Sequence, residues 1–184
     1  QAQLPLDLSL ETPTGLALGG WFIQGQKNAG VTLSALGING AQLGVVDKWQ
    51  AGWQDTLKGL RPDLLLLAYG TNEAFDPAFD QAQYREHLAQ TLGELRRQLP
   101  RTVIVLVGPP DSIRQRGAQG CAARVPQALA GIVATQREVA KTAGALFWDW
   151  QGFMGGACSI EQWQAQGLAR GDLIHLLSLL HICR

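Results

Sequence analysis

The feature that most constrains this chain is an apolar run, Leu64 to Ala68, enclosed by two polar turns. Five consecutive apolar residues bounded by turn signals favour a strand buried on both faces, as in a parallel sheet, and are too few for a buried helix. The turn after the run contains Gly70 and Asn72. Ligands of open parallel sheets bind beyond the carboxyl ends of the strands, where the Asn72 amide could donate to a developing negative charge. An Asn that caps its own turn is the alternative interpretation.

Two further apolar runs, residues 102–107 and 145–149, indicate two more buried strands. Between the runs, apolar residues recur every three or four positions, which is typical of amphipathic helices. These stripes predict three helices, and their members are Val46, Trp49, Trp53, Leu57 and Leu60, then Tyr84, Leu88, Leu92, Leu95 and Leu99, then Leu129, Ile132, Val133, Gln136, Val139, Ala140 and Ala143. Strands that alternate with helices predict an α/β fold, a three-layer α/β/α doubly wound parallel sheet with right-handed crossovers.

Local signals predict where these helices begin and end. Asp76 followed by Pro77 is a start signal for the second helix, because an acidic N-cap precedes proline at the first helical position. Pro100 predicts its end, and Gly144 fits the position just after the third helix. The glycine-rich residues 152–158 and the polar residues 112–125 are expected to be loops.

The first part of the chain has a different pattern. Residues 1–36 are expected to contain β structure: an edge strand at 4–10, the segments 16–18 and 21–23 on either side of a turn or bulge at Gly19-Gly20, and, after a second turn, a third strand at 31–36. We therefore predict a β-rich segment over residues 1–30 and an α/β domain over residues 31–184.

Charge and cysteine content narrow the classes of function. The chain has 15 Lys plus Arg and 15 Asp plus Glu, with no basic stripe, which argues against a nucleic acid as partner. No apolar stretch is long enough to span a membrane. Three cysteines, Cys121, Cys158 and Cys183, lack the spacing of a metal site, so neither a metal nor a cofactor is expected.

Asp172 and His175 lie three residues apart near the end of the chain. On a single turn, an Asp at this spacing can accept a hydrogen bond from the imidazole and fix its tautomer, as in a catalytic triad. A histidine that is merely a satisfied core group is the alternative. His87 is expected on the polar face of its helix, and His181 has no acidic neighbour in sequence.

The predicted topology brings several of these segments to one place. In a doubly wound sheet, the loops that follow each strand open on the same edge. Gly40, Asn72, Asp111 and the segment of Asp172 and His175 are therefore expected to meet in one cleft.

Three motifs in this order resemble the SGNH, or GDSL, hydrolase superfamily: Gly-Ile-Asn-Gly-Ala at 37–41, Tyr-Gly-Thr-Asn-Glu at 69–73 and Asp-Leu-Ile-His at 172–175. The resemblance covers roughly residues 31–176 and implies a flavodoxin-like fold. It also implies an oxyanion hole formed by the Gly40 N–H and the Asn72 side chain. His175 is then the general base, and Asp172 orients it toward a nucleophilic serine.

Further motifs are similar to those of bacterial envelope esterases that act on O-acetylated peptidoglycan: Gly-Pro-Pro-Asp at 108–111, Met-Gly-Gly at 154–156 and Trp163. This narrower resemblance implies a serine esterase that removes small acyl groups, such as acetyl, from a carbohydrate. It also implies a location in the bacterial envelope, either periplasmic or secreted.

The Gly-Asp-Ser block that carries the nucleophile in this superfamily is absent, and none of the chain's serines follows Gly-Asp; they are Ser9, Ser34, Ser112, Ser159 and Ser178. The nucleophilic serine is therefore unknown and is expected outside this chain. In the peptidoglycan-esterase branch a β-rich module can separate the serine block from the glycine block, and residues 1–30 look like the end of such an inserted module. This suggests an upstream segment of the same protein. The apolar end, residues 176–184, also departs from the family and suggests a truncated or altered terminus.

Two other functions use the same fold. An O-acyltransferase would use the same groups with a sugar hydroxyl in place of water, and a non-catalytic module would bind a glycan without a nucleophile. A flavodoxin-like nucleotide binder is disfavoured, because no glycine-rich phosphate loop precedes a helix at the required spacing.

A disulfide between Cys121 and Cys158 is a further expectation, since both lie in loops at the same sheet edge. An exported envelope protein would also meet an oxidising compartment. Two partly buried free thiols are the alternative.

Overall fold

The computed structural model describes residues 30–49, 51–114 and 120–177. The chain divides into two compact units, residues 1–36 and residues 37–184. The strands expected at 4–10, 16–18 and 21–23 lie outside the described residues. The second unit contains every helix and sheet strand that the structure describes.

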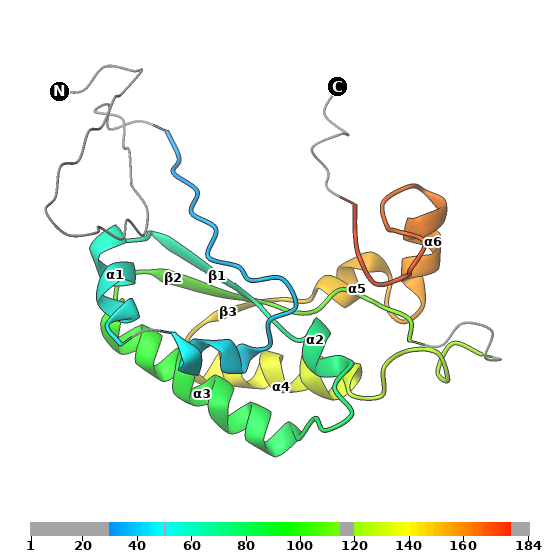
Figure 1. Cartoon of the computed structure of the whole chain (residues 1–184), viewed down its shortest axis with the longest axis horizontal. Coiled ribbons are helices and arrows are strands. Elements are labelled where there is room, and N and C mark those ends of the chain that lie inside the picture. Colours follow the sequence, from blue (N-terminus) through cyan, green and yellow to red (C-terminus); the bar gives the residue numbers. More distant parts are fainter. Residues whose placement is uncertain (1–29, 50, 115–119, 178–184) are drawn as a thin grey trace, which may run out of the picture. The chain divides into compact units, whose positions relative to one another are not determined.

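The sheet of the second unit has three parallel strands in the order β1 (Leu64–Ala68), β2 (Val103–Val107) and β3 (Leu146–Trp148) (Figure 1). Both ladders are parallel, and helices lie between successive strands in the sequence. Parallel neighbours need such crossover connections. The α/β class and the parallel sheet predicted from the sequence are therefore confirmed.

Seven helical segments accompany the sheet in the described residues: the 3-10 helix η1 (Leu43–Lys48), then α1 (Trp53–Leu60), α2 (Thr71–Ala74), α3 (Gln81–Gln98), α4 (Leu129–Thr142), α5 (Trp150–Met154) and α6 (Ser159–Ala165). The single helix expected along the stripe from Val46 to Leu60 is wrong, because η1 and α1 are separate. Gly52 precedes α1 at a φ of +89°, a left-handed conformation that interrupts a right-handed helix. Helix α5 also occupies residues 152–154 of the expected glycine-rich loop, and α6 begins directly after that loop.

Helix α3 begins later than its sequence signal suggests. The Oδ1 atom of Asp76 accepts from the backbone N–H of Ala78 at 2.8 Å, which closes a local turn rather than a helix. Asp80 is the true N-cap, and it accepts from the backbone N–H groups of Ala82 and Gln83. Asp76 and Asp80 are both suitable N-cap residues, and the sequence alone does not show which of them begins the helix. The predicted end before Pro100 is confirmed.

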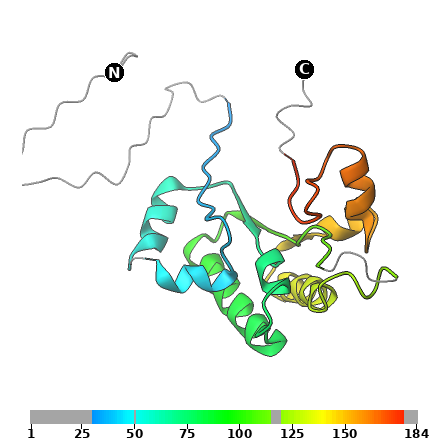
Figure 2. The same cartoon turned by 45° about the vertical axis from the view of Figure 1, so that its right-hand side comes forward.

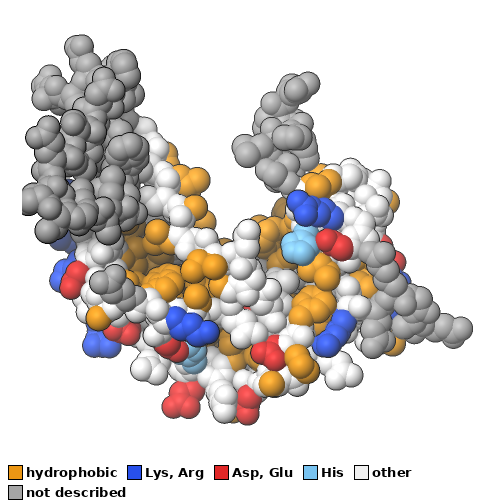
Figure 3. Space-filling model, viewed as in Figure 1, with side chains coloured by type: hydrophobic (Ala, Val, Ile, Leu, Met, Phe, Trp, Pro, Cys, Tyr) orange, Lys and Arg blue, Asp and Glu red, His pale blue; other side chains and the backbone are white. Residues whose placement is uncertain are grey.

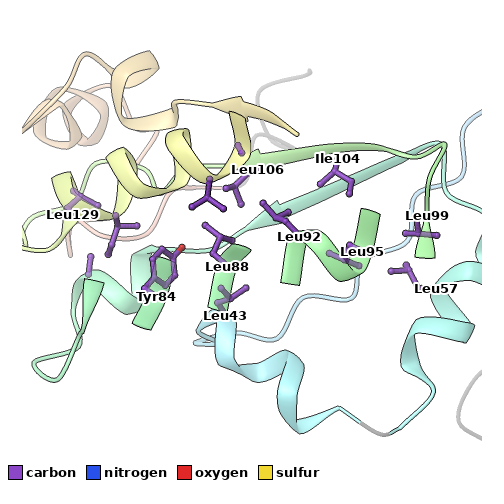
Figure 4. Close-up of a cluster of buried hydrophobic side chains, with 14 residues drawn as sticks. Leu43, Leu57, Tyr84, Leu88, Leu92, Leu95, Leu99, Ile104, Leu106 and Leu129 are labelled. Carbon is purple, nitrogen blue, oxygen red and sulfur yellow. The ribbon is translucent and has the colours of Figure 1, made fainter. Parts of the chain in front are cut away.

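The core lies between one face of the sheet and the helices α3 and α4, which Figures 1 and 2 show on the same side of the strands. The predicted stripe of α3 is buried along its whole length, and it contacts side chains of β2 and α4 (Figure 4). The buried members of this cluster include Tyr84, Leu88, Leu92, Leu95, Leu99, Ile104, Leu106, Leu129 and Ile132. Burial of one such side chain contributes about 1.5–3 kcal/mol, so this layer stabilises the unit.

The other face of the sheet is exposed in the described part of the chain. Exposure alternates along β1, where Leu64 and Leu66 are 52% and 55% exposed, and Leu146 and Trp148 of β3 are exposed as well. Hydrophobic side chains accordingly reach the surface in the space-filling view of Figure 3. The sequence predicted strands buried on both faces, and this is wrong for β1 and β3. On the same face of β2, Val103 is exposed, Val105 is half-buried and Val107 is buried. Apolar content alone does not reveal which elements cover a face.

Residues 31–36, expected to be a strand, form none in the structure. Val31 and Leu33 are almost fully exposed, and no described strand pairs with this segment. A strand needs a neighbour to satisfy its backbone N–H and C=O groups, so an alternating pattern is not sufficient. Likewise, β1 has β2 as its single hydrogen-bonded neighbour among the described strands.

None of the helices in the described ranges is long and apolar enough to cross a membrane.

Candidate active site

The turn after β1 requires glycine at position 70. Gly70 has a φ of +119°, and a Cβ there would lie 2.9 Å from the Cγ2 atom of Ile132 and 2.9 Å from the Cδ atom of Pro109. Side chains rarely adopt this conformation, and these neighbours leave no space for one. The tight turn places Asn72 on α2, immediately beyond the carboxyl end of β1.

Asn72 contacts the loop that contains Gly40. Its Nδ2 atom donates a hydrogen bond of 2.9 Å to the backbone oxygen of Ala41, 31 residues earlier in the chain. The side chain thus bonds across to another loop rather than capping its own turn. An amide nitrogen carries two hydrogens, so this contact leaves the second hydrogen for a ligand. Gly40 has a φ of +76°, and apart from its chain neighbours no atom of the described residues lies within 4 Å of the position a Cβ would occupy.

Glu73, on α2, joins the segment after Gly40 to the turn before Asn72 through buried hydrogen bonds. The residue is 4% exposed, its Oε1 accepts from the Leu43 N–H at 2.7 Å, and its Oε2 accepts from the Gly70 N–H at 2.9 Å. The sequence reasoning did not identify Glu73. Its position three residues after the helix N-cap, typical of a capping box, was the available signal.

Asp172 and His175 form a hydrogen-bonded pair. Oδ2 of Asp172 lies 2.9 Å from Nδ1 of His175, and Oδ1 accepts from the backbone N–H groups of Ile174 and His175 at 3.0 Å. The backbone hydrogen bond from His175 is the main cause that lowers the pKa of Asp172 to about 2. The carboxylate is therefore ionised at neutral pH, and Nδ1 donates to it. This tautomer leaves Nε2 as a proton acceptor.

The turn that carries this pair is exposed and locally closed. The side chains of His175 and Asp172 are 66% and 42% exposed. Leu173, between them, has a φ of +59°, which is unusual for a residue other than glycine. The two backbone hydrogen bonds to Asp172 hold the turn in this conformation. A solvent-exposed imidazole oriented by a carboxylate can accept a proton from a bound reactant.

A backbone hydrogen bond attaches this turn to the loop after β2, and Leu173 also packs against the hydrophobic cluster that contains Ile113. The backbone N–H of Ile113, in the loop after β2, donates to the carbonyl of Leu173 at 3.0 Å. Because β2 lies next to β1, the turn and Asn72 both belong to segments at the carboxyl edge of the sheet. Among the described residues no hydrogen bond or ion pair joins His175 to Asn72. The structure therefore joins Asn72 to the loop that contains Gly40, and Asp172 to His175, as two separate halves.

Asp111, expected in the same cleft, is instead fully buried. Its carboxylate accepts from Nε2 of Gln151 at 3.0 Å and from the backbone N–H of Ile160 at 3.1 Å, and burial raises its pKa. It connects the loop after β2 to α5 and α6. The topology correctly gives its sheet edge but not its depth, so its expected place in a cleft is wrong.

Neither of the serines that the structure describes in the second unit, Ser112 and Ser159, is exposed. Ser112 and Ser159 are buried, and their hydroxyl groups have no hydrogen-bond partner in the described part of the chain. Ser34 belongs to the other unit, and Ser9 and Ser178 lie outside the described residues. Likewise, no group of three or more His, Cys, Asp or Glu side chains among the described residues could hold a metal ion.

Cys121 and Cys158 form a disulfide, with their Cα atoms 5.9 Å apart, as predicted. Cys158 is the residue before α6, so the bridge connects that helix to the long loop after β2. The same loop contacts the Asp172 turn through Ile113. The disulfide therefore braces the elements that support the exposed pair.

The solved structures that are similar to this chain include a peptidoglycan O-acetylesterase and a lipase/acylhydrolase. A structure of a peptidoglycan O-acetylesterase is 38% identical, with a TM-score of 0.73, over 78% of this chain and 41% of that one. The lipase/acylhydrolase from Enterococcus faecalis is 18% identical, with a TM-score of 0.54, over 76% of this chain and 64% of that one, and supports the fold alone. The chain thus spans less than two thirds of both proteins. A comparison with curated protein sequences returned no match.

The chain also matches the profile of the GDSL-like lipase/acylhydrolase family over residues 16–181. The match includes the loops of Gly40 and Asn72 and the turn of Asp172 and His175. It agrees with the parallel sheet and with the order of the three motifs in the sequence. The chain therefore belongs to the GDSL-like lipase/acylhydrolase family.

Proposed function

We propose that this chain carries the oxyanion hole and the Asp–His pair of an SGNH-type serine esterase that removes small acyl groups, acetyl in particular, from a carbohydrate such as peptidoglycan. The observation that carries the proposal is the 2.9 Å hydrogen bond between Asp172 and His175 on an exposed turn. The 38% identity to a peptidoglycan O-acetylesterase supports the choice of acyl group and substrate class.

The proposed reaction proceeds in two halves. In the first, the serine oxygen attacks the ester carbonyl while Nε2 of His175 takes the hydroxyl proton and Asp172 stabilises the imidazolium. The Gly40 N–H and the Asn72 amide donate to the oxyanion of the tetrahedral intermediate. The sugar alcohol then leaves with the proton from His175. In the second half, water attacks the acyl-enzyme in the same way and releases the carboxylic acid and free serine.

The nucleophile is proposed to come from a segment of the same protein upstream of residue 1. Two observations support this proposal. Ser112 and Ser159 are both buried, and the match to the peptidoglycan O-acetylesterase covers 41% of the length of that protein chain. The same segment would also give β1 a second neighbour and cover the exposed side chains of Leu64 and Leu66. An uncovered apolar edge strand otherwise favours aggregation.

The proposed place of action is outside the cytoplasm, in the periplasm or the medium. The disulfide between Cys121 and Cys158 supports this location, because such bonds persist in oxidising compartments. The likeness to an enzyme of peptidoglycan supports it as well.

The test is to assay the full-length protein on O-acetylated peptidoglycan and to measure the acetate released. We expect acetate release that His175→Ala abolishes, and the controls are de-O-acetylated peptidoglycan and an added sugar acceptor. Transfer of acetyl to the acceptor without free acetate would instead identify an acyltransferase. Glycan binding with neither product would identify a non-catalytic module.

A further inference from the structure

We infer that Glu73 is a positioning residue for the oxyanion hole, an inference that rests on the proposed function. Glu73 is 4% exposed, so its carboxylate is not presented to a substrate. It contacts the backbone of both loops that carry the proposed donors, Gly40 and Asn72.

The two oxygens of Glu73 are divided between the two loops. Oε1 accepts from the N–H of Leu43, three residues after Gly40, at 2.7 Å. Oε2 accepts from the N–H of Gly70, two residues before Asn72, at 2.9 Å. One rigid carboxylate group therefore fixes the distance between the two backbone segments. Leu43 is itself buried, so its N–H has little access to water as a substitute.

This arrangement requires an acceptor at both oxygen positions. Hydrogen bonds from N–H groups to a carboxylate are shorter and about twice as strong as neutral ones. A glutamine would direct its NH2 group at one of the two backbone donors, and an aspartate is one methylene shorter. Among the described residues, no Lys, Arg or His forms an ion pair with Glu73. Burial of a carboxylate is costly, and these backbone contacts offset the cost.

Two further bonds join the same loops nearer the surface. Asn72 donates to the Ala41 oxygen at 2.9 Å, and Nε2 of Gln42 donates to Oδ2 of Asp76 at 2.8 Å. Both of these hydrogen bonds are exposed, whereas the two hydrogen bonds of Glu73 are buried. If the buried contact is lost, the Gly40 loop can shift relative to Asn72. A misplacement of about 1 Å costs on the order of a hundredfold in rate.

The test compares the full-length protein with its Glu73→Gln and Glu73→Asp variants on an acetyl ester. Rates are normalised to active sites titrated with a fluorophosphonate, so that a loss of folded protein does not lower the measured kcat. We expect kcat to fall about 10- to 100-fold while KM stays within about twofold, because oxyanion contacts act in the transition state. An unchanged normalised kcat in both variants would overturn the inference.

The matched control is Glu94→Gln, since Glu94 accepts a hydrogen bond from Gln54 at 3.1 Å and, among the described residues, forms no hydrogen bond or ion pair with the segments of Gly40 and Asn72. It should keep the wild-type kcat. If it lowered kcat as much as Glu73→Gln, the effect would not be specific to the loops, and the inference would fail.

A double-mutant cycle with Asn72→Ala separates this inference from the proposed function. If Glu73 acts through the oxyanion hole, its substitution costs much less in the Asn72→Ala background than in the wild type. Fully additive losses would overturn the inference and leave the proposed function intact. An Asn72→Ala variant with wild-type kcat would overturn both.

A measurement on the unmodified protein does not depend on whether the variants fold. The backbone amides of Leu43 and Gly70 should exchange with solvent slowly and together, since one carboxylate accepts from both. Exchange of either amide as fast as that of exposed loop amides would contradict the contacts that carry the inference.

Discussion

The two halves of the candidate site are held in different ways. The loops of Gly40 and Asn72 are joined by a buried carboxylate and by a side-chain bond 31 residues apart in sequence. Asp172 and His175 lie on an exposed turn that closes on itself within four residues. The first half therefore depends on tertiary packing, and the second depends on local hydrogen bonds. Substitutions in the two halves should differ accordingly in their effects on rate and stability.

The largest effect is expected from His175→Ala in the full-length protein. Removal of the general base should lower kcat by about 10⁵- to 10⁶-fold, by analogy with triad histidines in other serine hydrolases. The thermal midpoint should change little, because the side chain is mostly exposed. The matched control is His87→Ala, since His87 also pairs with an aspartate, Asp47, at 3.2 Å but on another part of the unit. Activity that survives His175→Ala and is lost with His87→Ala would refute the assignment.

Asp172→Ala should be the next most damaging change. The aspartate orients the imidazole but does not transfer the proton itself, so we expect a loss of about 10⁴-fold in kcat. The same assay on an acetyl ester measures it. A loss greater than that of His175→Ala would mean that Asp172 has another role.

Asn72→Ala should lower kcat by about 10²- to 10³-fold, the usual cost of one oxyanion donor. KM should change much less than kcat, because the donor acts on charge that develops in the transition state. Wild-type turnover on an activated ester would remove Asn72 from the site.

Loss of the disulfide should affect stability more than chemistry. The bridge closes a separation of 37 residues, for which the chain-entropy relation gives about 4 kcal/mol. We expect Cys121→Ser to lower the free energy of unfolding by up to this amount, measured by urea denaturation. Because the bridge braces the loop beside Ile113, local exchange should rise at the Asp172 turn before it rises at Leu43. The opposite order would contradict the proposed division of the site.

The smallest effect concerns pH. The pKa of Asp172 is lowered to about 2, against about 3.9 in an unfolded chain. A carboxyl whose pKa is lower in the folded state adds stability above the unfolded pKa and loses it as pH falls through the folded pKa. The turn should therefore stay closed at pH 5 and open between about pH 4 and pH 2. The carbon shift of the Asp172 carboxyl measures this, and a titration midpoint near 4 would contradict it.

Sequence predicts the parts of this molecule that repeat or that carry a local signature. The stripe of α3 follows from periodicity and the strand at Leu64–Ala68 from a continuous apolar run between two turns. Short motifs in a fixed order predict Asn72 and His175 as site residues. Glu73 was missed because its partner Leu43 is 30 residues away and is revealed only by the fold. Asp111 was misplaced because a topology gives the sheet edge and not the depth of a side chain.

Two errors in the fold predicted from the sequence have related causes. Residues 31–36 have the alternation of a strand, and Leu64–Ala68 has the composition of a fully buried one. Pairing and coverage depend on neighbouring elements, which neither pattern encodes. The start of α3 was wrong for a local reason, since Asp76 and Asp80 are both able to cap.

The most direct test of the account is to find the nucleophile. The full-length protein and residues 1–184 alone are treated with a serine-directed fluorophosphonate, assayed with p-nitrophenyl acetate and mapped by mass spectrometry. The account predicts that residues 1–184 alone neither turn over the ester nor react, and that the full-length protein is labelled at a serine upstream of residue 1. Saturable turnover by residues 1–184, with the label on one of their own five serines, would contradict it.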